Sequence, residues 1–90
     1  MTVTIDGLVF ESSNYDADGD VLYLSRGESN IAVDALLTPE GHGVRFDSDG
    51  DVIGVTIINA RRLLAQDGYL TITIPRVVRL EASELAVMLS

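Results

Sequence analysis

The chain has 90 residues, a net charge of -8, no cysteine and one histidine. A chain of this length forms one hydrophobic core, so we expect a single domain over residues 1–90. Without cysteine there is no disulfide or thiolate chemistry, and a single histidine forms no zinc cluster. The acidic balance disfavours nucleic acid, whose phosphates bind patches of Lys and Arg.

Hydropathy and the first residues bear on where the protein resides. No apolar run approaches the roughly 20 residues that a membrane-spanning helix needs. The first residues lack the basic start and the apolar block of an export signal. We therefore expect a soluble, cytoplasmic protein with no membrane partner.

The N-terminal segment predicts a β-hairpin. Residues 2–5 and 8–10 are rich in apolar and β-branched side chains, and Asp6-Gly7 separates them. Asp-Gly between two such runs is a strong hairpin signal, because Gly adopts a positive φ without a Cβ clash.

An internal repeat is the most informative feature of the chain. The run YDADGDVL, which begins at Tyr15, recurs as FDSDGDVI, which begins at Phe46. Each copy places a D-x-D-G-D turn between an aromatic residue and an aliphatic pair. The repeat therefore predicts two further hairpins.

Strands are predicted around these two turns, at residues 21–24, 44–46 and 52–58. Residues 52–58 are apolar at both the odd and the even positions, which point to opposite faces of a strand. We therefore expect a central strand covered on both faces, by a helix on one and by a second layer or chain on the other. Gly54 would mark a bulge or a close approach. A shorter strand is predicted at residues 31–33, before a Pro- and Gly-rich loop at 38–43.

A helix and a strand are predicted next. Asn59 is a candidate N-cap and Gly68 a candidate end for a helix that buries Ala60, Leu63 and Leu64. Residues 69–74 then alternate as a half-exposed strand.

The tail at residues 83–90 predicts a short terminal helix, because Ser83 is a good N-cap and an acid follows it. Its apolar residues would lie on almost every side of the helix. Such a helix must be buried, either on its own sheet or across a subunit interface. On that ground we expect a homodimer.

These elements together predict an α+β fold: a small, mostly antiparallel sheet of repeated hairpins, one helix after the central strand and a short C-terminal helix. The residues from Asn14 to Leu64 also resemble the bacterial and archaeal domain-of-unknown-function family numbered 2283. The resemblance lies in the runs YDADGDVLYL and FDSDGDVIGV, which begin at Tyr15 and Phe46. It implies a compact β-rich domain with a helix after the last repeated strand, and it brings no assigned catalytic residues. The chain departs from the family pattern where Val55-Thr56-Ile57 replaces a frequently acidic position.

The two D-x-D-G-D turns are the candidate metal site, because hard carboxylate oxygens in a turn suit calcium. The candidate ligands are Asp16, Asp18, Asp20, Asp47, Asp49 and Asp51. An EF-hand needs Gly at its sixth position and Glu at its twelfth. Those positions hold Val21 and Gly27 in one copy, and Val52 and Ile58 in the other. The alternative interpretation is that Asp and Gly serve only the tight turns and that the charges discourage strand pairing.

Other candidate chemistry is sparse. His42 is the only side chain that titrates near neutrality, but it has no recognisable nucleophile partner, so we interpret it as a loop residue. Four arginines follow Asp51 and are expected to pair with the domain's own acids: Arg61, Arg62, Arg76 and Arg79. With no catalytic constellation and no cofactor motif, we do not expect an enzyme.

The charge distribution leads to the main functional prediction. Eleven of the fourteen acidic residues lie in the first 51 residues, with only two of the six arginines. We expect a non-catalytic binding or regulatory module whose acidic first half recognises a basic protein partner. The alternative is a divalent-cation-binding protein that uses the aspartate turns, and a third hypothesis is a hydrolase that uses His42.

Overall fold

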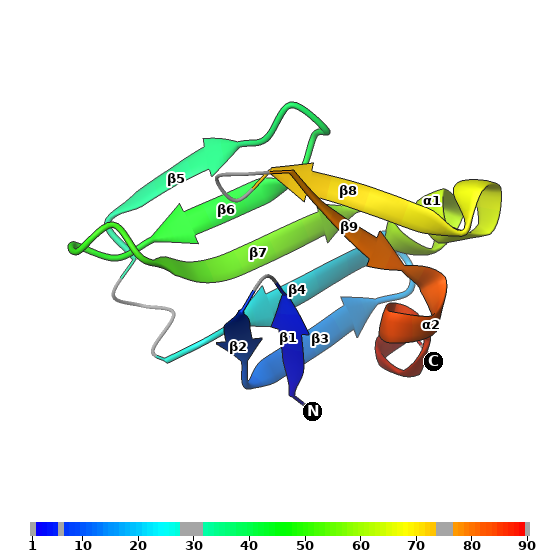
Figure 1. The fold of residues 1–90 in the computed structure, drawn as a ribbon, viewed down its shortest axis with the longest axis horizontal. Coiled ribbons are helices and arrows are strands. Elements are labelled where there is room, and N and C mark those ends of the chain that lie inside the picture. Colours follow the sequence, from blue (N-terminus) through cyan, green and yellow to red (C-terminus); the bar gives the residue numbers. More distant parts are fainter. Residues whose placement is uncertain (1, 6, 28–31, 74–76, 90) are drawn as a thin grey trace.

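The computed structural model of the protein describes residues 2–5, 7–27, 32–73 and 77–89 (Figure 1). The elements in chain order are β1 (Val3–Ile5), β2 (Leu8–Phe10), β3 (Ser12–Asp16), β4 (Val21–Ser25), β5 (Asp34–Leu37), β6 (Gly43–Phe46), β7 (Val52–Ile58), α1 (Ala60–Asp67), β8 (Tyr69–Thr73), β9 (Val77–Glu81), α2 (Ala82–Leu85) and the 3-10 helix η2 (Ala86–Leu89). The predicted α+β fold, with its antiparallel hairpins and its two helical segments, is confirmed.

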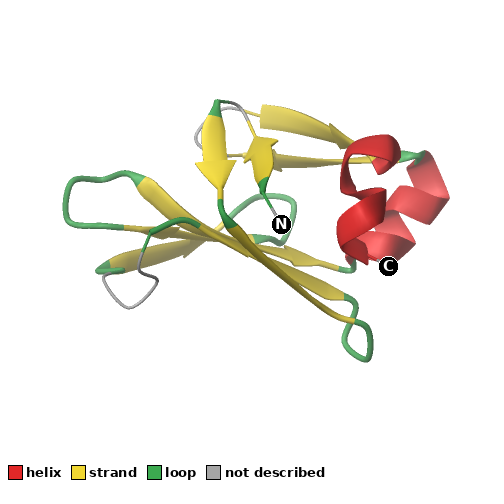
Figure 2. Ribbon diagram, turned by 90° about the horizontal axis from the view of Figure 1, so that it is seen from below, coloured by secondary structure: helices red, strands yellow, loops and turns green. Residues whose placement is uncertain are grey.

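The main sheet has five strands in the order β3-β4-β7-β6-β5, and β7 is central as predicted. All of its neighbouring strands are antiparallel. The hairpins β1-β2 and β8-β9 form two separate two-stranded sheets. Figure 2 shows these hairpins and the helices on one face of the main sheet, with the opposite face open.

The hydrophobic core lies between the main sheet and this second layer. Its largest fully buried side chains are Phe10, Ile5, Leu22, Leu24, Ile57, Ile72 and Leu85. Full burial of one such side chain contributes roughly 1.5–3 kcal/mol, so the small hairpins are held to the sheet mainly by these contacts.

A register shift explains why β7 is apolar at both its odd and its even positions. Phe46 pairs with Val52 while Arg45 pairs with Gly54, so one extra residue of β7 lies between the two pairs. This bulge turns Val52 to the core side together with Val55 and Ile57. At the bulge Ile53 is buried as well, although it lies outside the core cluster, so burial of β7 extends beyond its core face there.

Gly54 marks both features expected of it, the bulge and a close approach. The Arg45 side chain crosses Gly54 so closely that a Cβ there would lie 2.6 Å from Nε of Arg45. A side chain at position 54 would therefore displace the Arg45 guanidinium from its place over the strand.

The strand predicted at residues 31–33 is wrong. Residue 31 lies outside the described residues, Ala32 and Val33 are not in a strand, and β5 begins at Asp34. The sequence of β5, Asp-Ala-Leu-Leu, contains no β-branched residue, so propensity did not mark it. Its pairing with β6, continued by a hydrogen bond from Thr38 N to the His42 carbonyl, holds it extended.

The helix α1 begins and ends where the sequence predicted, but its N-terminus is capped differently. Asn59 adopts φ 59° and ψ 39° and makes no side-chain cap, whereas Gly68 ends the helix at φ 78°. In β8, Leu70 and Ile72 are buried and alternate with half-buried residues, as predicted. Residues 74 and 75, the expected end of that strand, lie outside the described residues.

The terminal helix begins one residue before the predicted N-cap. Glu81 is the N-cap of α2 and forms a capping box with Glu84, so Ser83 lies within the first turn. Leu85 and Leu89 are buried within this chain. These two side chains are covered without a subunit interface, and the homodimer stays a prediction. Among the described residues, no helix has the length and apolar character to cross a membrane.

We predict that Gly54→Ala destabilises the fold by about 0.5–1 kcal/mol, because the new Cβ displaces only the flexible end of the Arg45 side chain. Gly43→Ala is the matched control, since a Cβ there would meet Thr56 at an ordinary 3.6 Å. Urea unfolding measures both. In an Arg45→Ala background the Gly54→Ala penalty is expected to shrink, and equal penalties for the two glycines would contradict this account.

Candidate functional site

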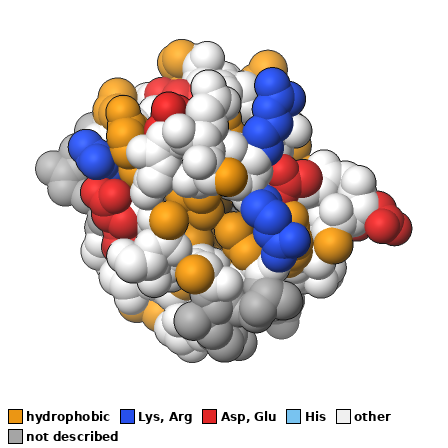
Figure 3. All heavy atoms as spheres, turned by 90° about the vertical axis from the view of Figure 1, so that its right-hand side faces the viewer, with side chains coloured by type: hydrophobic (Ala, Val, Ile, Leu, Met, Phe, Trp, Pro, Cys, Tyr) orange, Lys and Arg blue, Asp and Glu red, His pale blue; other side chains and the backbone are white. Residues whose placement is uncertain are grey.

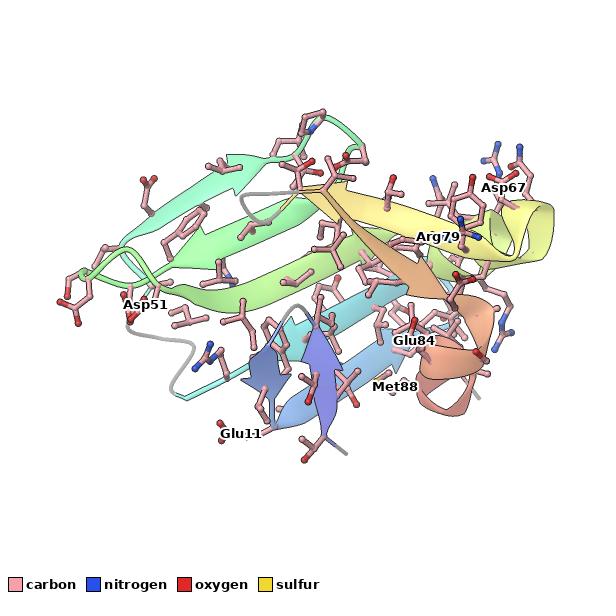
Figure 4. All side chains as sticks on the ribbon, in the orientation of Figure 1. Glu11, Asp51, Asp67, Arg79, Glu84 and Met88 are labelled. Carbon is pink, nitrogen blue, oxygen red and sulfur yellow. The ribbon has the colours of Figure 1, made fainter. Side chains whose placement is uncertain are left out.

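The two aspartate turns lie at opposite ends of the main sheet. In the β4–β7 register Val21 pairs with Ile58, so the first turn lies beside the end of β7. The second turn leads directly into the start of β7 at Val52. Figure 4 shows Asp51 at the far end of the sheet from Asp67 of α1. The six carboxylates therefore do not form one site.

In the first turn, Asp20 caps the helix α1 from 41 positions away in the sequence. Its Oδ1 accepts hydrogen bonds from the Arg61 N–H at 2.8 Å and from the Tyr15 hydroxyl at 2.7 Å. Its Oδ2 accepts from the Arg62 N–H at 3.1 Å, and its carbonyl accepts from the Ala60 N–H at 3.1 Å. Three of the four unpaired N-terminal donors of α1 are thus satisfied by one residue.

This network fixes the charge state of Asp20. Partial burial alone would raise the pKa of its carboxyl group, but the hydrogen bonds from Tyr15, Arg61 and Arg62 and the Arg61 charge outweigh burial and lower it. The same contact with Asp20 raises the pKa of Tyr15. Asp20 is therefore a structural anion.

The second turn leaves its carboxylates much freer. Asp47 Oδ1 accepts hydrogen bonds from the N–H groups of Asp49 at 2.9 Å and Asp51 at 3.0 Å. One oxygen from each of Asp47, Asp49 and Asp51 lies within 4.8 Å of the others. Phe46 stands where the first copy has Tyr15, so no hydroxyl reaches Asp51 as Tyr15 reaches Asp20. Of the two turns, only this one gathers its three acids.

The repeated motif also folds into two different loops. The first turn places its left-handed residue at Asp20, with φ 54°, whereas the second places it at Gly50, with φ 84°. In both turns the first aspartate accepts a hydrogen bond from the N–H two residues later. The shared motif therefore determines the conformation at the start of each turn, whereas the conformation at the end depends on neighbouring residues.

His42 lies in the loop before β6, as predicted, but it is buried, with 1% of its surface exposed. Its Nδ1 accepts a hydrogen bond from the Ile58 N–H at 3.1 Å. The proton of the neutral ring must then be on Nε2, which is buried without a hydrogen-bond partner among the described residues. With both ring nitrogens so committed, His42 has no free lone pair to serve as a general base.

A pocket of about 270 Å³ lies beside His42. It is lined by Glu40, His42, Leu63, Asp67, Tyr69, Leu70 and Thr71. The Glu40 carboxylate is not free within this pocket, because it accepts hydrogen bonds from the Thr73 N–H at 3.1 Å and the Thr73 hydroxyl at 2.8 Å. These bonds join the loop before β6 to strand β8.

The arginines that follow Asp51 do not share one role. Arg79 forms an ion pair with Glu81 at 2.8 Å and lies 3.8 Å from the centre of the Tyr69 ring. Arg61 lies over the Tyr15 ring, 5.2 Å from its centre. Arg76 lies outside the described residues. Pairing with the domain's own acids is thus seen for Arg79.

Sequence reasoning missed an exposed apolar surface on the edge strand β5. All four of its residues are exposed, and Leu36 and Leu37 keep 50% and 74% of their surface accessible. Val33, just before the strand, is 66% exposed. The apolar residues at 33, 36 and 37 carried the only signal, and it was indistinguishable from that of a buried strand.

We predict that Asp20→Ala lowers the free energy of unfolding by about 1–3 kcal/mol, because α1 loses its cap and Tyr15 its partner. Asp51→Ala, at the equivalent position of the repeat, removes no such contact and is expected to change stability by less than about 0.5 kcal/mol. Chemical unfolding at pH 7 tests the pair. The difference between wild type and Asp20→Ala persists above the ordinary value of 3.8 and is lost as pH falls through the lowered pKa. Similar losses for the two variants would contradict the capping role.

A second prediction concerns His42, whose pKa is lowered by burial against a smaller opposing effect of Glu40. Its unfolded form binds a proton below about pH 6.5 while the folded ring stays neutral, so stability falls as the pH drops from 7 toward 5.5. His42→Gln keeps an acceptor for Ile58 but does not titrate, so its stability is expected to stay flat over that interval. Unfolding curves at several pH values compare the two proteins, and parallel declines would rule His42 out as the cause.

Comparison with known proteins places the chain among its relatives. A family model described as a protein of unknown function (DUF2283) matches residues 13–61, close to the segment that the aspartate motifs indicated. The match spans both hairpins of the repeat and the start of α1. No curated protein and no solved structure matches the chain. The chain therefore belongs to the DUF2283 family of proteins of unknown function.

Proposed function

We propose that this protein is a non-catalytic binding module that takes up an extended, basic segment of a partner protein along the edge of β5. The observation that carries the proposal is the complete exposure of this edge strand. Strand addition to a sheet edge is a recurring mode of peptide recognition, in which backbone hydrogen bonds supply affinity and alternate side chains supply specificity.

The backbone of β5 supports this mode. Within the described part of the chain, β5 is the outermost strand of the main sheet and pairs with β6 alone (Figure 1). Natural proteins usually protect such edges with charge, bulges or a covering loop, because an unpaired edge attracts other strands. Here one outward donor is protected locally, since the Ala35 N–H bonds the Asp34 carboxylate at 2.8 Å.

The side chains around β5 indicate what the partner must offer. Leu36 and Leu37 point to opposite faces of the sheet, so apolar residues of an added strand would find contacts on both faces. Their exposure in the free protein makes this patch the apolar part of the interface.

The acidic residues near the start of β5 favour a basic partner. Asp34 pairs with Phe46 across β5 and β6, which brings it next to the acidic turn that begins at Asp47. A Lys or Arg in the partner would therefore meet the carboxylates of Asp34, Asp47, Asp49 and Asp51 at the start of β5. An ion pair with Asp34 would also release the Ala35 N–H for pairing, so the basic residue and the added strand reinforce each other.

The test compares capture of partners from source lysate by wild type and by edge variants. Ala35→Pro removes an outward donor and no described β5–β6 bond, so we expect it to fold and to lose capture. Leu37→Asn is expected to weaken capture about tenfold or more, whereas Val77→Asn, an equally exposed apolar site on β9, leaves it unchanged. Capture that is indifferent to Ala35→Pro and Leu37→Asn would refute the edge as the binding site. Light scattering on the same variants shows whether a second copy occupies the edge instead.

A second candidate is a divalent cation at the second turn, favoured by the clustering of Asp47, Asp49 and Asp51 within 4.8 Å. Calcium would neutralise these carboxylates and stabilise the fold by mass action. We expect the melting temperature of chelator-treated protein to rise on adding millimolar calcium, and the Asp49→Asn/Asp51→Asn variant to show no rise. An unchanged wild-type melting temperature would eliminate this candidate.

A further inference from the structure

An apolar groove of about 410 Å³ lies between α1 and the C-terminal helices α2 and η2. Its lining residues are Arg61, Leu64, Ala65, Ala82, Ala86 and Leu89. Figure 3 shows hydrophobic side chains gathered around a hollow on this face of the molecule, with basic side chains at its margin. Three alanines among six lining residues keep the walls short, and so leave the space open.

Among the described residues, Arg61 is the one charged residue that lines the groove, in a protein whose net charge is -8. Its position is set by two contacts: Nη2 donates a hydrogen bond to the Leu89 carbonyl, and the guanidinium lies over the Tyr15 ring. A guanidinium has five N–H donors, so the Leu89 bond leaves donors for an oxyanion. The capped start of α1 holds the backbone of Arg61 in place.

We propose that this groove binds a medium-chain carboxylate, with its alkyl chain among the alanines and leucines and its carboxylate on Arg61. The volume falls within the range of small-ligand sites. Each buried methylene contributes about 0.8 kcal/mol, and Arg pairs with carboxylates in a two-pronged geometry. Because all other lining residues are apolar, a ligand with a single charged end fits better than one that is polar throughout. The groove lies at the opposite end of the main sheet from the second turn, so the proposal is independent of the β5 edge.

The probe is decanoate, titrated below its critical micelle concentration into the full chain and followed by calorimetry. We expect saturable binding at one site, and at least about tenfold weaker binding to Arg61→Gln, because the carboxylate loses its partner. Arg62→Gln is the matched control, since it removes the same charge from the next position of α1 without touching the groove. Its affinity should equal that of wild type.

Two further measurements separate the groove from a general effect of charge or folding. Ala86→Leu fills the groove while keeping Arg61, so it should also abolish binding in a protein whose melting curve remains cooperative. Decanol, which has the chain without the charge, should bind at least about tenfold more weakly than decanoate. The proposal is overturned if decanoate gives no saturable heat, if Arg61→Gln and Arg62→Gln lose affinity alike, or if Ala86→Leu still binds. A concentration-dependent dimer that Ala86→Leu disrupts would overturn it too, since a second copy would then occupy the groove.

Discussion

The carboxylate of Asp20 is the contact on which the arrangement of sheet and helices depends. It ties the turn between β3 and β4 to the first N–H groups of α1, two parts of the chain that are remote in sequence. The direction in which α1 leaves β7 is therefore fixed by a hydrogen-bonded anion at the helix N-terminus, where the helix dipole also favours negative charge. Arg61 and Leu63 lie on that helix, so the groove and the His42 pocket both take their walls from it.

The repeat shows how one motif can serve two ends of a sheet differently. The change from Tyr15 to Phe46 removes the hydroxyl that orients the last carboxylate of the turn. The first turn also lies beside the N-terminus of α1, and Asp20, the last acid of the turn, caps that helix. At the second turn Asp47 is half-buried, Asp49 and Asp51 are exposed, and the three carboxylates lie close to one another. The same D-x-D-G-D pattern thus gives a structural anion at one end of the sheet and a cluster of carboxylates at the other.

Local signals made most of the fold predictable. The Asp-Gly turns, the apolar run of β7 and the alternation of β8 each specify their element within a few residues. The parts that sequence reasoning missed depend on partners elsewhere. Asn59 had the composition of a cap, but a residue 41 positions away supplies the cap. His42 lies just before the start of β6, where its ring accepts a hydrogen bond from the Ile58 N–H, and no local sequence pattern predicts that contact.

The same non-local contacts explain why the two proposed binding surfaces can act separately. The acidic turn and the β5 edge are joined through β6, so a basic strand bound there would act on one end of the sheet. The groove is bounded by α1, α2 and η2. The Asp20 cap ties α1 to the main sheet, and the hydrogen bond from Ala82 N to the Gly68 carbonyl ties the start of α2 to the end of α1. Coupling between the surfaces could pass along β7, which pairs with both β4 and β6, or through the hydrogen bonds from Thr73 of β8 to Glu40 in the loop before β6. Coupling between two sites requires a connecting element that has two alternative arrangements. We expect this sheet to keep one arrangement, so each surface should bind its ligand without changing the affinity of the other.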